Sequence, residues 1–289
     1  MASILTNLFD GVAYGMLLFV LACGLAVTLG LMNFVNLAHG AFAMAGGYIC
    51  AVLVNNSGWP FFAALPLAFV GSALIGIALE RTLYRHLYSR SHLDQVLFSI
   101  GLVFMSVAAV DYIMGSSRVF IKLPAALEGQ IDLFGVGIGR YRLMIVVICG
   151  LLTLGLQLIL AKTRFGSRLR AAVDDPRAAI GLGINVPQVF ALTFAFGCGL
   201  AGLGGALSAE ILGLDPYFPL KFLIYFLIVV TVGGSSSITG PFLASLLLGI
   251  ADVAGKYYVP KVGPFVIYTV MIVILLWRPN GLFGRTAAR

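Results

Sequence analysis

The chain has 289 residues, of which 61% are hydrophobic and 10% are charged, and its formal net charge is +7. An ordinary soluble domain carries about 25% charged residues, so this composition, with a mean hydropathy of +1.05, excludes a large soluble domain beside the membrane segments. We interpret the positive charge as that of cytoplasmic loops rather than as a nucleic-acid-binding surface, and we expect one membrane domain over residues 1–289.

The first long segment, Gly11–Leu79, contains no Asp, Glu, Lys or Arg. Each crossing of a bilayer needs roughly 20 mostly apolar residues, so a run of this length predicts several crossings. In its middle lies a polar stretch bounded by glycines, Gly30–Gly40, which holds Asn33, Asn36 and His39. Lipid cannot satisfy polar groups at this depth, so we expect them to face protein or a water-filled path.

Segments without charged residues predict nine transmembrane or half-membrane helices, in an all-α integral membrane protein with about eight to nine such helices. They are Gly11–Leu31, Ala41–Val54, Phe61–Leu79, Val96–Val110, Leu143–Ala161, Val189–Ala209, Phe222–Val232, Phe242–Ala251 and Gly263–Trp277. The second, seventh and eighth are short for a full crossing. Gly11 with Gly15, and Gly197 with Ala201 and Gly205, place small residues along one helix face, which predicts close helix packing either inside the chain or against a second subunit.

Lys and Arg in short loops set the orientation. Basic residues gather in the loop at 81–90, in the loop at 162–177 and in the tail at 278–289, so we expect these three on the cytoplasmic side and the N-terminus outside. If Ala41–Val54 is re-entrant, the N-terminus lies inside instead. The exceptions to this bias are Arg118, Lys122, Arg140, Arg142, Lys221, Lys256 and Lys261.

The cytoplasmic loop at 162–188 contains a short predicted helix, from Pro176 to about Leu182. Asp175 can cap its first turn, Pro176 suits its first position, and Gly181 or Gly183 can end it. We expect it to expose Ala178, Ala179 and Ile180, which suits insertion into a groove of a cytoplasmic partner. The alternative is a surface helix that lies on the membrane interface.

A second polar break follows Phe222–Val232, at Gly233–Pro241. A membrane segment comes inward, a short glycine-bounded stretch interrupts it, and a helix returns outward, as at the first break. Paired interruptions at corresponding points of two halves indicate a transport pathway, and their shared direction suggests parallel internal repeats. The alternative is that each break is a tight loop at the cytoplasmic interface. The predicted path residues are Asn33, Asn36, His39, Gly40, Gly233, Gly234, Ser235, Ser236, Ser237 and Thr239.

Four acidic residues lie near the membrane: Asp10, Asp111, Glu210 and Asp252. In the predicted topology all four map to outer ends of their segments. This favours an external mouth, formed by Asp111, Glu210 and Asp252, that attracts a cationic group or docks a soluble partner, over a proton relay near the midplane. The alternative is that they are ordinary interfacial charges.

The sequence predicts no catalytic residues, no cofactor and no metal site. The three histidines and four cysteines have no metal-ligand spacing. Gly249 and Gly255-Lys256 differ from a phosphate-binding loop, because five residues separate the glycines and Tyr257 replaces the Ser or Thr that would hold magnesium. We therefore expect that the chain does not hydrolyse ATP by itself.

An ordered set of motifs resembles the permease family of branched-chain amino acid ABC importers, and more narrowly its shorter permease subunit. The motifs cover nearly the whole chain. They are Asn33–Phe42 with Gly46-Gly-Tyr48, Glu80–Arg85, Arg164–Val186, Thr231–Pro241 and the closing Arg278–Gly284.

The resemblance implies a multi-pass permease of the bacterial inner membrane that pairs, within membrane lipid, with a second homologous permease. It also implies two cytoplasmic ATP-binding subunits, a periplasmic substrate-binding protein, and translocation-path residues at the two breaks. On this interpretation, residues of the 162–188 loop couple to the ATP-binding subunits: Arg164, Arg168, Arg170, Asp175, Pro176, Ala178, Ala179 and Gly181.

The cargo stays open, since relatives of this family are assigned to urea, short amides and other amino acids as well as to leucine, isoleucine and valine. A stand-alone secondary carrier or channel is the alternative from another class of protein. An intramembrane enzyme lacks a candidate nucleophile and base.

Overall fold

The computed structural model describes residues 2–32, 34–88, 90–133, 136–234 and 238–283. Eight of the nine predicted membrane segments fall inside one helix each, and α11 has the predicted bounds, whereas Ala41–Val54 runs from α2 into the helical turn that follows it. The nine helices are α1 (Ala2–Met32), α2 (His39–Ala51), α3 (Phe61–Thr82), α4 (His92–Met114), α5 (Arg140–Lys162), α8 (Val186–Leu212), α9 (Phe218–Gly233), α10 (Thr239–Tyr258) and α11 (Gly263–Trp277). The fold is therefore that of an all-helical membrane protein, as its composition predicts.

Shorter elements complete the described chain. Helices α6 (Arg164–Asp174) and α7 (Pro176–Gly181) fill the loop between α5 and α8. Other short helical turns are the π-helical turn Val52–Asn56, which prolongs α2, and the 3-10 turns Tyr84–His86 and Ala125–Leu127. Strands β1 (Gln130–Leu133) and β2 (Val136–Gly139) form an antiparallel hairpin that pairs Gln130 with Gly139. The sequence predicts only a long connection there.

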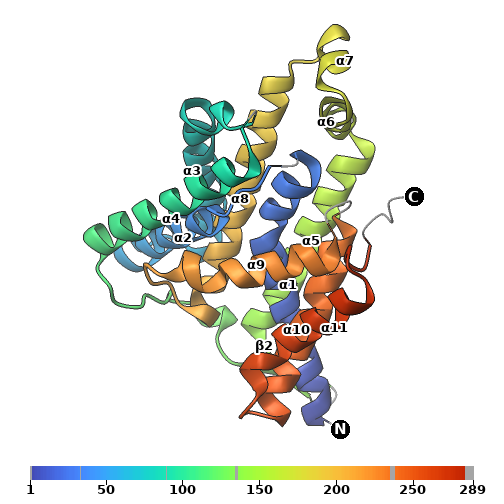
Figure 1. Cartoon of the computed structure of the whole chain (residues 1–289). Coiled ribbons are helices and arrows are strands. Elements are labelled where there is room, and N and C mark those ends of the chain that lie inside the picture. Colours follow the sequence, from blue (N-terminus) through green and yellow to red (C-terminus); the bar gives the residue numbers. More distant parts are fainter. Residues whose placement is uncertain (1, 33, 89, 134–135, 235–237, 284–289) are drawn as a thin grey trace.

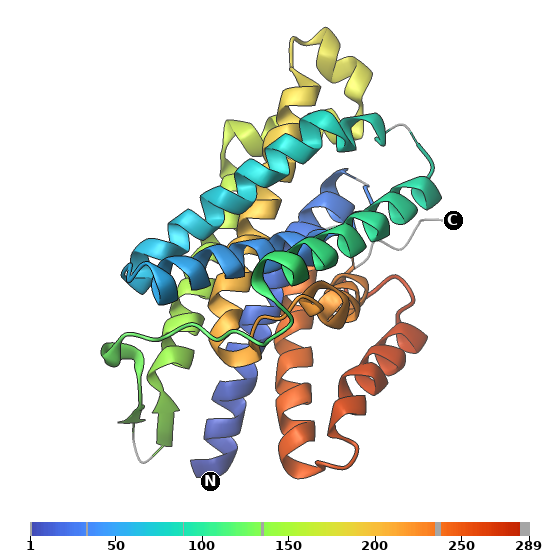
Figure 2. The ribbon, with the colours of Figure 1, turned by 90° about the vertical axis from the view of Figure 1, so that its left-hand side faces the viewer.

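Five of the helices in the described chain are long and apolar enough to cross a membrane: α1, α3, α4, α5 and α8. Helices α9 and α11 are apolar but shorter. Both views show α9 running across the bundle rather than along α1 (Figures 1 and 2).

Helices α1 and α8 form the centre of the molecule. Most of their side chains are buried inside the chain, whereas fewer than a third of those of α3, α4 and α5 are buried. In a bilayer, such exposed apolar faces meet lipid or another membrane subunit. The largest fully buried side chains include Phe19, Phe194 and Tyr84, which lie in one continuous apolar core.

Small residues allow the central helices to approach closely. A Cβ on Gly249 of α10 would lie 2.4 Å from the backbone of Gly15 in α1, and one on Gly205 of α8 would lie 1.8 Å from the Ala43 carbonyl oxygen in α2. The small-residue stripes predicted from the sequence are therefore seams inside this chain. Packing rather than hydrophobicity drives helix association in lipid, so these seams stabilise the bundle.

The two ends of the bundle differ. The N-terminus, the β-hairpin and the connection between α10 and α11 lie at one end, which we call the N-terminal end, and α6 and α7 project from the opposite end (Figure 1). The turn after α3 also lies toward the α7 end, since Tyr88 packs on Phe190 near the start of α8 with ring centroids 5.7 Å apart. This arrangement agrees with the predicted sidedness of the loops.

Candidate functional site

The first break is held by polar side chains from the turn between α3 and α4 and from the first turn of α4. The Asn36 carbonyl oxygen Oδ1 accepts hydrogen bonds from the Ala38 amide at 3.1 Å and from the Tyr84 hydroxyl at 3.0 Å. The Val35 amide donates to Gln95 Oε1 at 3.1 Å. Asn36, Tyr84 and Gln95 are all buried. Protein groups thus bond the Val35 and Ala38 amides and Asn36 Oδ1, whereas Asn36 Nδ2 is buried without a hydrogen-bond partner among the described residues.

His39 and Gly40 start α2 inside the bundle. His39 is fully buried, and a Cβ on Gly24 of α1 would lie 1.9 Å from its Nε2. Neither ring nitrogen makes a hydrogen bond of good geometry within the described residues, although the Gly197 carbonyl of α8 lies beside the ring. A Cβ on Gly40 would meet Pro219 of α9 at 2.8 Å. The start of α2 is thus wedged between α1, α8 and α9.

The second break is held by backbone. Gly234 has a φ of +86°, and its amide donates to the Val230 carbonyl at 2.9 Å. The C-terminal segment runs alongside, where the Leu282 amide donates to the Val232 carbonyl at 2.8 Å. Gly233 lies directly against Pro241, and Thr239, at the start of α10, is exposed. The predicted path residues Asn33, Ser235, Ser236 and Ser237 lie outside the described residues.

Both breaks lie at a similar level along α1. His39 meets α1 at Gly24, and Phe242, just after the second break, packs on Phe19 of α1 with ring centroids 5.2 Å apart. Helix α1 has 31 residues, so at a rise of about 1.5 Å per residue it is about 46 Å long. The two contacts on α1, at Phe19 and Gly24, are five residues apart. They lie in the middle third of the helix and in the turn that follows it. Whether the breaks lie inside the membrane or at its interface stays a prediction.

The predicted cap of α7 is present. Asp175 Oδ1 accepts hydrogen bonds from the Arg177 and Ala178 amides, each at 3.0 Å, and Pro176 occupies the first turn. The helix ends before Gly183, whose φ is +80°, and the Ile184 amide donates to the Ala179 carbonyl at 3.0 Å. From the sequence, either Gly181 or Gly183 can end this helix, and in the structure Gly183 has the left-handed conformation that such an end requires.

One expectation for α7 is wrong. Ala179 is buried, because it faces a small apolar cluster with Leu169, Ala172, Val186 and Val189, which ties α6 and α7 to the start of α8. A short helix needs such a buried contact to be held in place, since isolated helices of this length are unstable. The exposed side chains are instead Ala178, Ile180 and Leu182, the last two 59% and 80% exposed.

The other predicted coupling residues lie on the surface of the same projection. Arg164, Arg168 and Arg170 are exposed on α6, and Gly181 is exposed at the end of α7. Arg168 lines a cavity of about 510 Å³ between α6, the turn after α7 and the start of α8. Arg170 donates to the Leu160 carbonyl at the end of α5.

The predicted outer acids separate into three environments. Asp252 is buried and bonds Lys256 Nζ at 2.6 Å, and it lines a cavity with Asp10 at the N-terminal end of the bundle. Glu210 lines a neighbouring cavity that shares Arg142 and Ile211 with the first. Asp111 is exposed near the end of α4. Their role as an outer mouth stays a prediction.

Four of the basic residues that fall outside the three predicted cytoplasmic segments form ion pairs with acidic residues. Arg142 pairs with Asp10 and Lys256 with Asp252. Lys221 pairs with Asp215 at 2.5 Å, and Arg118 approaches the same carboxylate at 3.9 Å. A basic residue whose charge is neutralised by a nearby carboxylate is weaker evidence against the predicted orientation of the chain in the membrane.

Three residues with clear positions in the structure have no predicted role. Tyr84 and Gln95 hold the first break, and Asp215 gathers two basic residues between α8 and α9. Tyr84 lies in Glu80–Arg85, one of the motifs by which the chain resembles the permease family. This motif is the one feature of the sequence that pointed to Tyr84. Among the described residues, no group of three or more His, Cys, Asp or Glu side chains could hold a metal ion.

The helices, the two central breaks and the projecting α6–α7 hairpin define a multi-pass membrane protein with the architecture of a transport subunit. The chain belongs to the family described as branched-chain amino acid transport system, permease component, whose profile matches residues 7–275. Within that family it is of the shorter, LivH type, as the following relatives show.

The chain is 29% identical to the high-affinity branched-chain amino acid transport system permease protein LivH of Escherichia coli K12, over 97% of this chain and 96% of the relative. It is also 29% identical to BraD of Pseudomonas aeruginosa PAO1, with the same coverage. It is 25% identical to LivM of Salmonella typhimurium, over 94% of this chain and only 68% of LivM. No solved structure matches the chain.

Proposed function

We propose that this chain is the membrane permease subunit of an ATP-driven importer for branched-chain or related amino acids in a bacterial inner membrane. It pairs with a second homologous permease, two cytoplasmic ATP-binding subunits drive it, and a periplasmic binding protein delivers the substrate. Membership of the permease family supports this proposal, as does the match to both LivH and LivM, which are separate permease proteins.

The observation that carries the proposal is the α6–α7 hairpin. It projects from the bundle (Figure 2) and is stiffened by its own apolar cluster, and it presents Ile180 and Leu182 to the surroundings. Exposed apolar side chains on a short rigid helix suit a groove on a protein partner. In the proposed orientation this partner is the ATP-binding subunit, and residues 162–188 form the coupling loop of a single permease domain.

The transport path in this proposal runs past the two breaks, with Asn36, His39 and Gly40 on one side and Gly233, Gly234 and Thr239 on the other. Movement of the hairpin on ATP binding switches the path between outward-facing and inward-facing states. The depth of both breaks along α1 supports this assignment, since polar backbone there must line protein or a water-filled space.

Leu182→Asp tests the coupling. Because Leu182 is 80% exposed, the change should leave folding intact while the ATP-binding subunit no longer co-purifies, and uptake should fall at least about tenfold, the effect of losing roughly 1.4 kcal/mol of contact. Val262→Asp, at an exposed apolar position in the α10–α11 connection, is the matched control. Ala179→Glu is unsuitable, because it would disrupt the cluster beneath the hairpin.

Normal uptake by the Leu182→Asp protein would contradict the proposal. A chain that purifies alone and transports in liposomes without ATP would instead identify a secondary carrier. In such a carrier Asp111→Asn or Glu210→Gln should remove pH-dependent transport.

A further inference from the structure

Two adjoining cavities lie at the end of the bundle from which α6 and α7 project. The first, of about 260 Å³, opens between α1, α5, α6 and α8, and its lining is almost entirely apolar, with Leu156, Ile159 and Phe196 among it. The second is the cavity of about 510 Å³ between α6, the turn after α7 and the start of α8. Phe165 and Leu192 line both cavities. The two together therefore form one groove, which we call the α5–α8 groove.

Along α8 the lining of this groove changes from polar to apolar. Gln188 lines the wider cavity, Leu192 lines both, and Phe196 lines the apolar one. Gln188 and Phe196 are about 12 Å apart along an axis that rises about 1.5 Å per residue. Helix α5 ends at Lys162 and α8 starts at Val186, and both are long enough to cross a membrane. The polar part of the groove therefore lies at the level of lipid headgroups and the apolar part among acyl chains.

The polar part of the groove carries an uncompensated positive charge. Arg168 is the only charged residue among the described residues that line the groove. It is exposed and makes no ion pair with a described residue. The Gln188 side chain lines the same cavity and adds N–H donors. An anionic group fits this arrangement.

The surrounding loop has the same sign of charge. Residues 162–177 contain more basic than acidic side chains, namely Lys162, Arg164, Arg168, Arg170 and Arg177 against Asp174 and Asp175. Basic clusters directly beside the end of a membrane helix attract anionic lipids, and basic pockets between membrane helices bind their headgroups.

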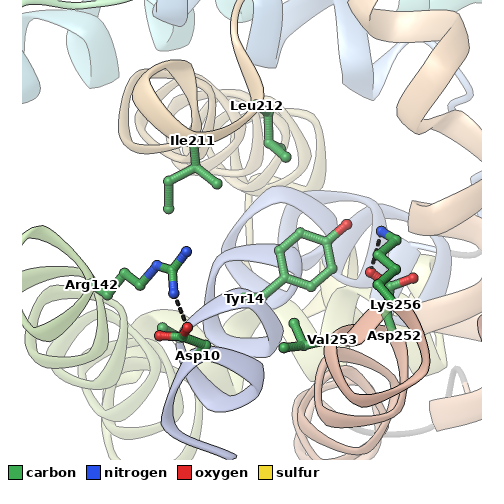
Figure 3. A pocket seen from close by; sticks show the side chains of 9 residues that line it. Asp10, Tyr14, Arg142, Ile211, Leu212, Asp252, Val253 and Lys256 are labelled. Carbon is green, nitrogen blue, oxygen red and sulfur yellow. Dashed lines mark hydrogen bonds and ion pairs between the residues drawn. The ribbon is translucent and has the colours of Figure 1, made fainter. Parts of the chain in front are cut away.

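The cavity at the N-terminal end of the bundle has the opposite arrangement. Its basic residues are already paired, Arg142 with Asp10 and Lys256 with Asp252 (Figure 3). A charge that lies against its counter-charge exerts little net attraction on a third ion, whereas Arg168 keeps its full charge for one. The α5–α8 groove is thus the better of the two places for an anionic ligand.

Contacts within the chain hold the walls of the groove in place. Arg170 donates to the Leu160 carbonyl at the end of α5, and Gly166 of α6 lies directly against the same carbonyl. Leu169, on the buried face of α6, packs in one apolar cluster with Val189 of α8. Helix α6 is therefore fixed against both α5 and α8, and a preformed site loses less conformational entropy when a ligand binds.

We propose that the α5–α8 groove binds one anionic phospholipid. Its phosphate accepts hydrogen bonds from Arg168 and Gln188, one acyl chain lies in the apolar cavity against Leu192 and Phe196, and the other chain stays in the bilayer. A phospholipid fits better than a segment of a protein partner, because the groove is basic at the headgroup level and apolar at the depth of acyl chains.

The inference goes beyond the proposed function and does not depend on it. The lipid would anchor the base of the α6–α7 hairpin to the membrane, while Ile180 of α7, which is exposed and lines neither cavity, stays available to a protein partner.

Native mass spectrometry of the purified protein measures this binding directly. The chain is purified from its native membrane with the subunits that accompany it, delipidated in detergent, and titrated with dioleoylphosphatidylglycerol or with dioleoylphosphatidylcholine, which has no net charge. The anionic lipid should bind about tenfold more tightly, as expected for hydrogen bonds to a charged group. Arg168→Gln, at an exposed position where folding should be unaffected, should abolish this preference. Leu192→Trp should weaken the binding of both lipids, because the larger side chain fills the apolar cavity.

Matched controls separate the groove from the rest of the lipid-facing surface. Arg90→Gln changes an exposed arginine in the turn after α3, and Leu158→Trp enlarges an exposed side chain of α5, and neither residue lines the groove. Both variants should bind dioleoylphosphatidylglycerol like the wild type. Glycerol phosphate, which has the phosphate but no acyl chain, should compete at least about a hundredfold less well than the lipid, since it leaves the apolar cavity unfilled.

Three outcomes would overturn the inference: equal affinity of the wild type for the two lipids, equal loss of the preference in Arg90→Gln and Arg168→Gln, or lipid binding unchanged in both Arg168→Gln and Leu192→Trp. Unchanged lipid binding by Leu192→Trp together with loss of the accompanying subunits would assign the groove to a protein partner. Competition by glycerol phosphate as strong as by the lipid would reduce the site to one for a free phosphate group.

Discussion

The two breaks lie at similar depth, but they are stabilised in different ways. Side chains hold the first, through Tyr84 from the turn between α3 and α4 and through Gln95 from the first turn of α4. Backbone holds the second, through close contact of Gly233 with Pro241 and hydrogen bonds to the C-terminal segment. Substitutions can remove the hydrogen bonds of a side-chain network one at a time. A close contact between two backbone segments, by contrast, leaves almost no room for an added atom. The side-chain hydrogen bonds at the first break can therefore be removed one at a time, whereas the contact of Gly233 with Pro241 at the second leaves no room for an added atom.

Gly233→Ala should have the largest effect. A Cβ there would lie 2.3 Å from the Pro241 nitrogen and 2.5 Å from the Gly240 carbonyl carbon, and neither backbone atom can move aside. We expect a loss of about 1–3 kcal/mol or more from overpacking, seen as a lower melting temperature in detergent and loss of uptake. Gly155→Ala is the control, since a Cβ there meets nothing within 4 Å. A wild-type melting temperature for Gly233→Ala would show that the second break is not rigid.

Gln95→Leu should weaken the first break. It removes the acceptor of the Val35 amide and the donor to the Leu87 and Arg90 carbonyls, at 3.2 and 3.3 Å. Each buried group left without a partner costs about 1–3 kcal/mol, so the melting temperature should fall and uptake should drop severalfold. Gln188→Leu, at an exposed position near the start of α8, serves for comparison. If both variants behave alike, side chains do not hold the first break.

Arg278→Ala should have the smallest effect. Its guanidinium donates to the Leu282 carbonyl at 3.2 Å and lies 5.5 Å from the Trp277 ring, both at an exposed site. Such contacts contribute about 0.5–1 kcal/mol, so we expect a small shift in melting temperature and uptake within twofold of wild type. A collapse of uptake would mean that a side chain, and not only backbone, secures the second break.

The position of every membrane helix was predictable because long apolar segments between charged or glycine-rich stretches have few other stable states in a bilayer. The α7 helix was predictable for a local reason as well, since Asp175, Pro176 and Gly183 fix its two ends through their own backbone neighbours. Both breaks were visible as polar, glycine-bounded interruptions. Their role as a path remains a proposal.

Other features depend on contacts between residues far apart in the chain. The burial of Ala179 is decided by α6 and α8, and the sequence alone suggested the opposite. Tyr84 and Gln95 reach Asn36 and Val35 across 48 and 60 residues, which no local pattern indicates.

By itself, then, the amino-acid sequence determined the class of protein, its helices and the caps of α7, because burial in lipid and local backbone bonding act within short segments. Only the tertiary structure decided which charges pair and which face of α7 is exposed. Those properties arise where distant helices meet, and the small-residue seams that bring α1, α8 and α10 together set their geometry.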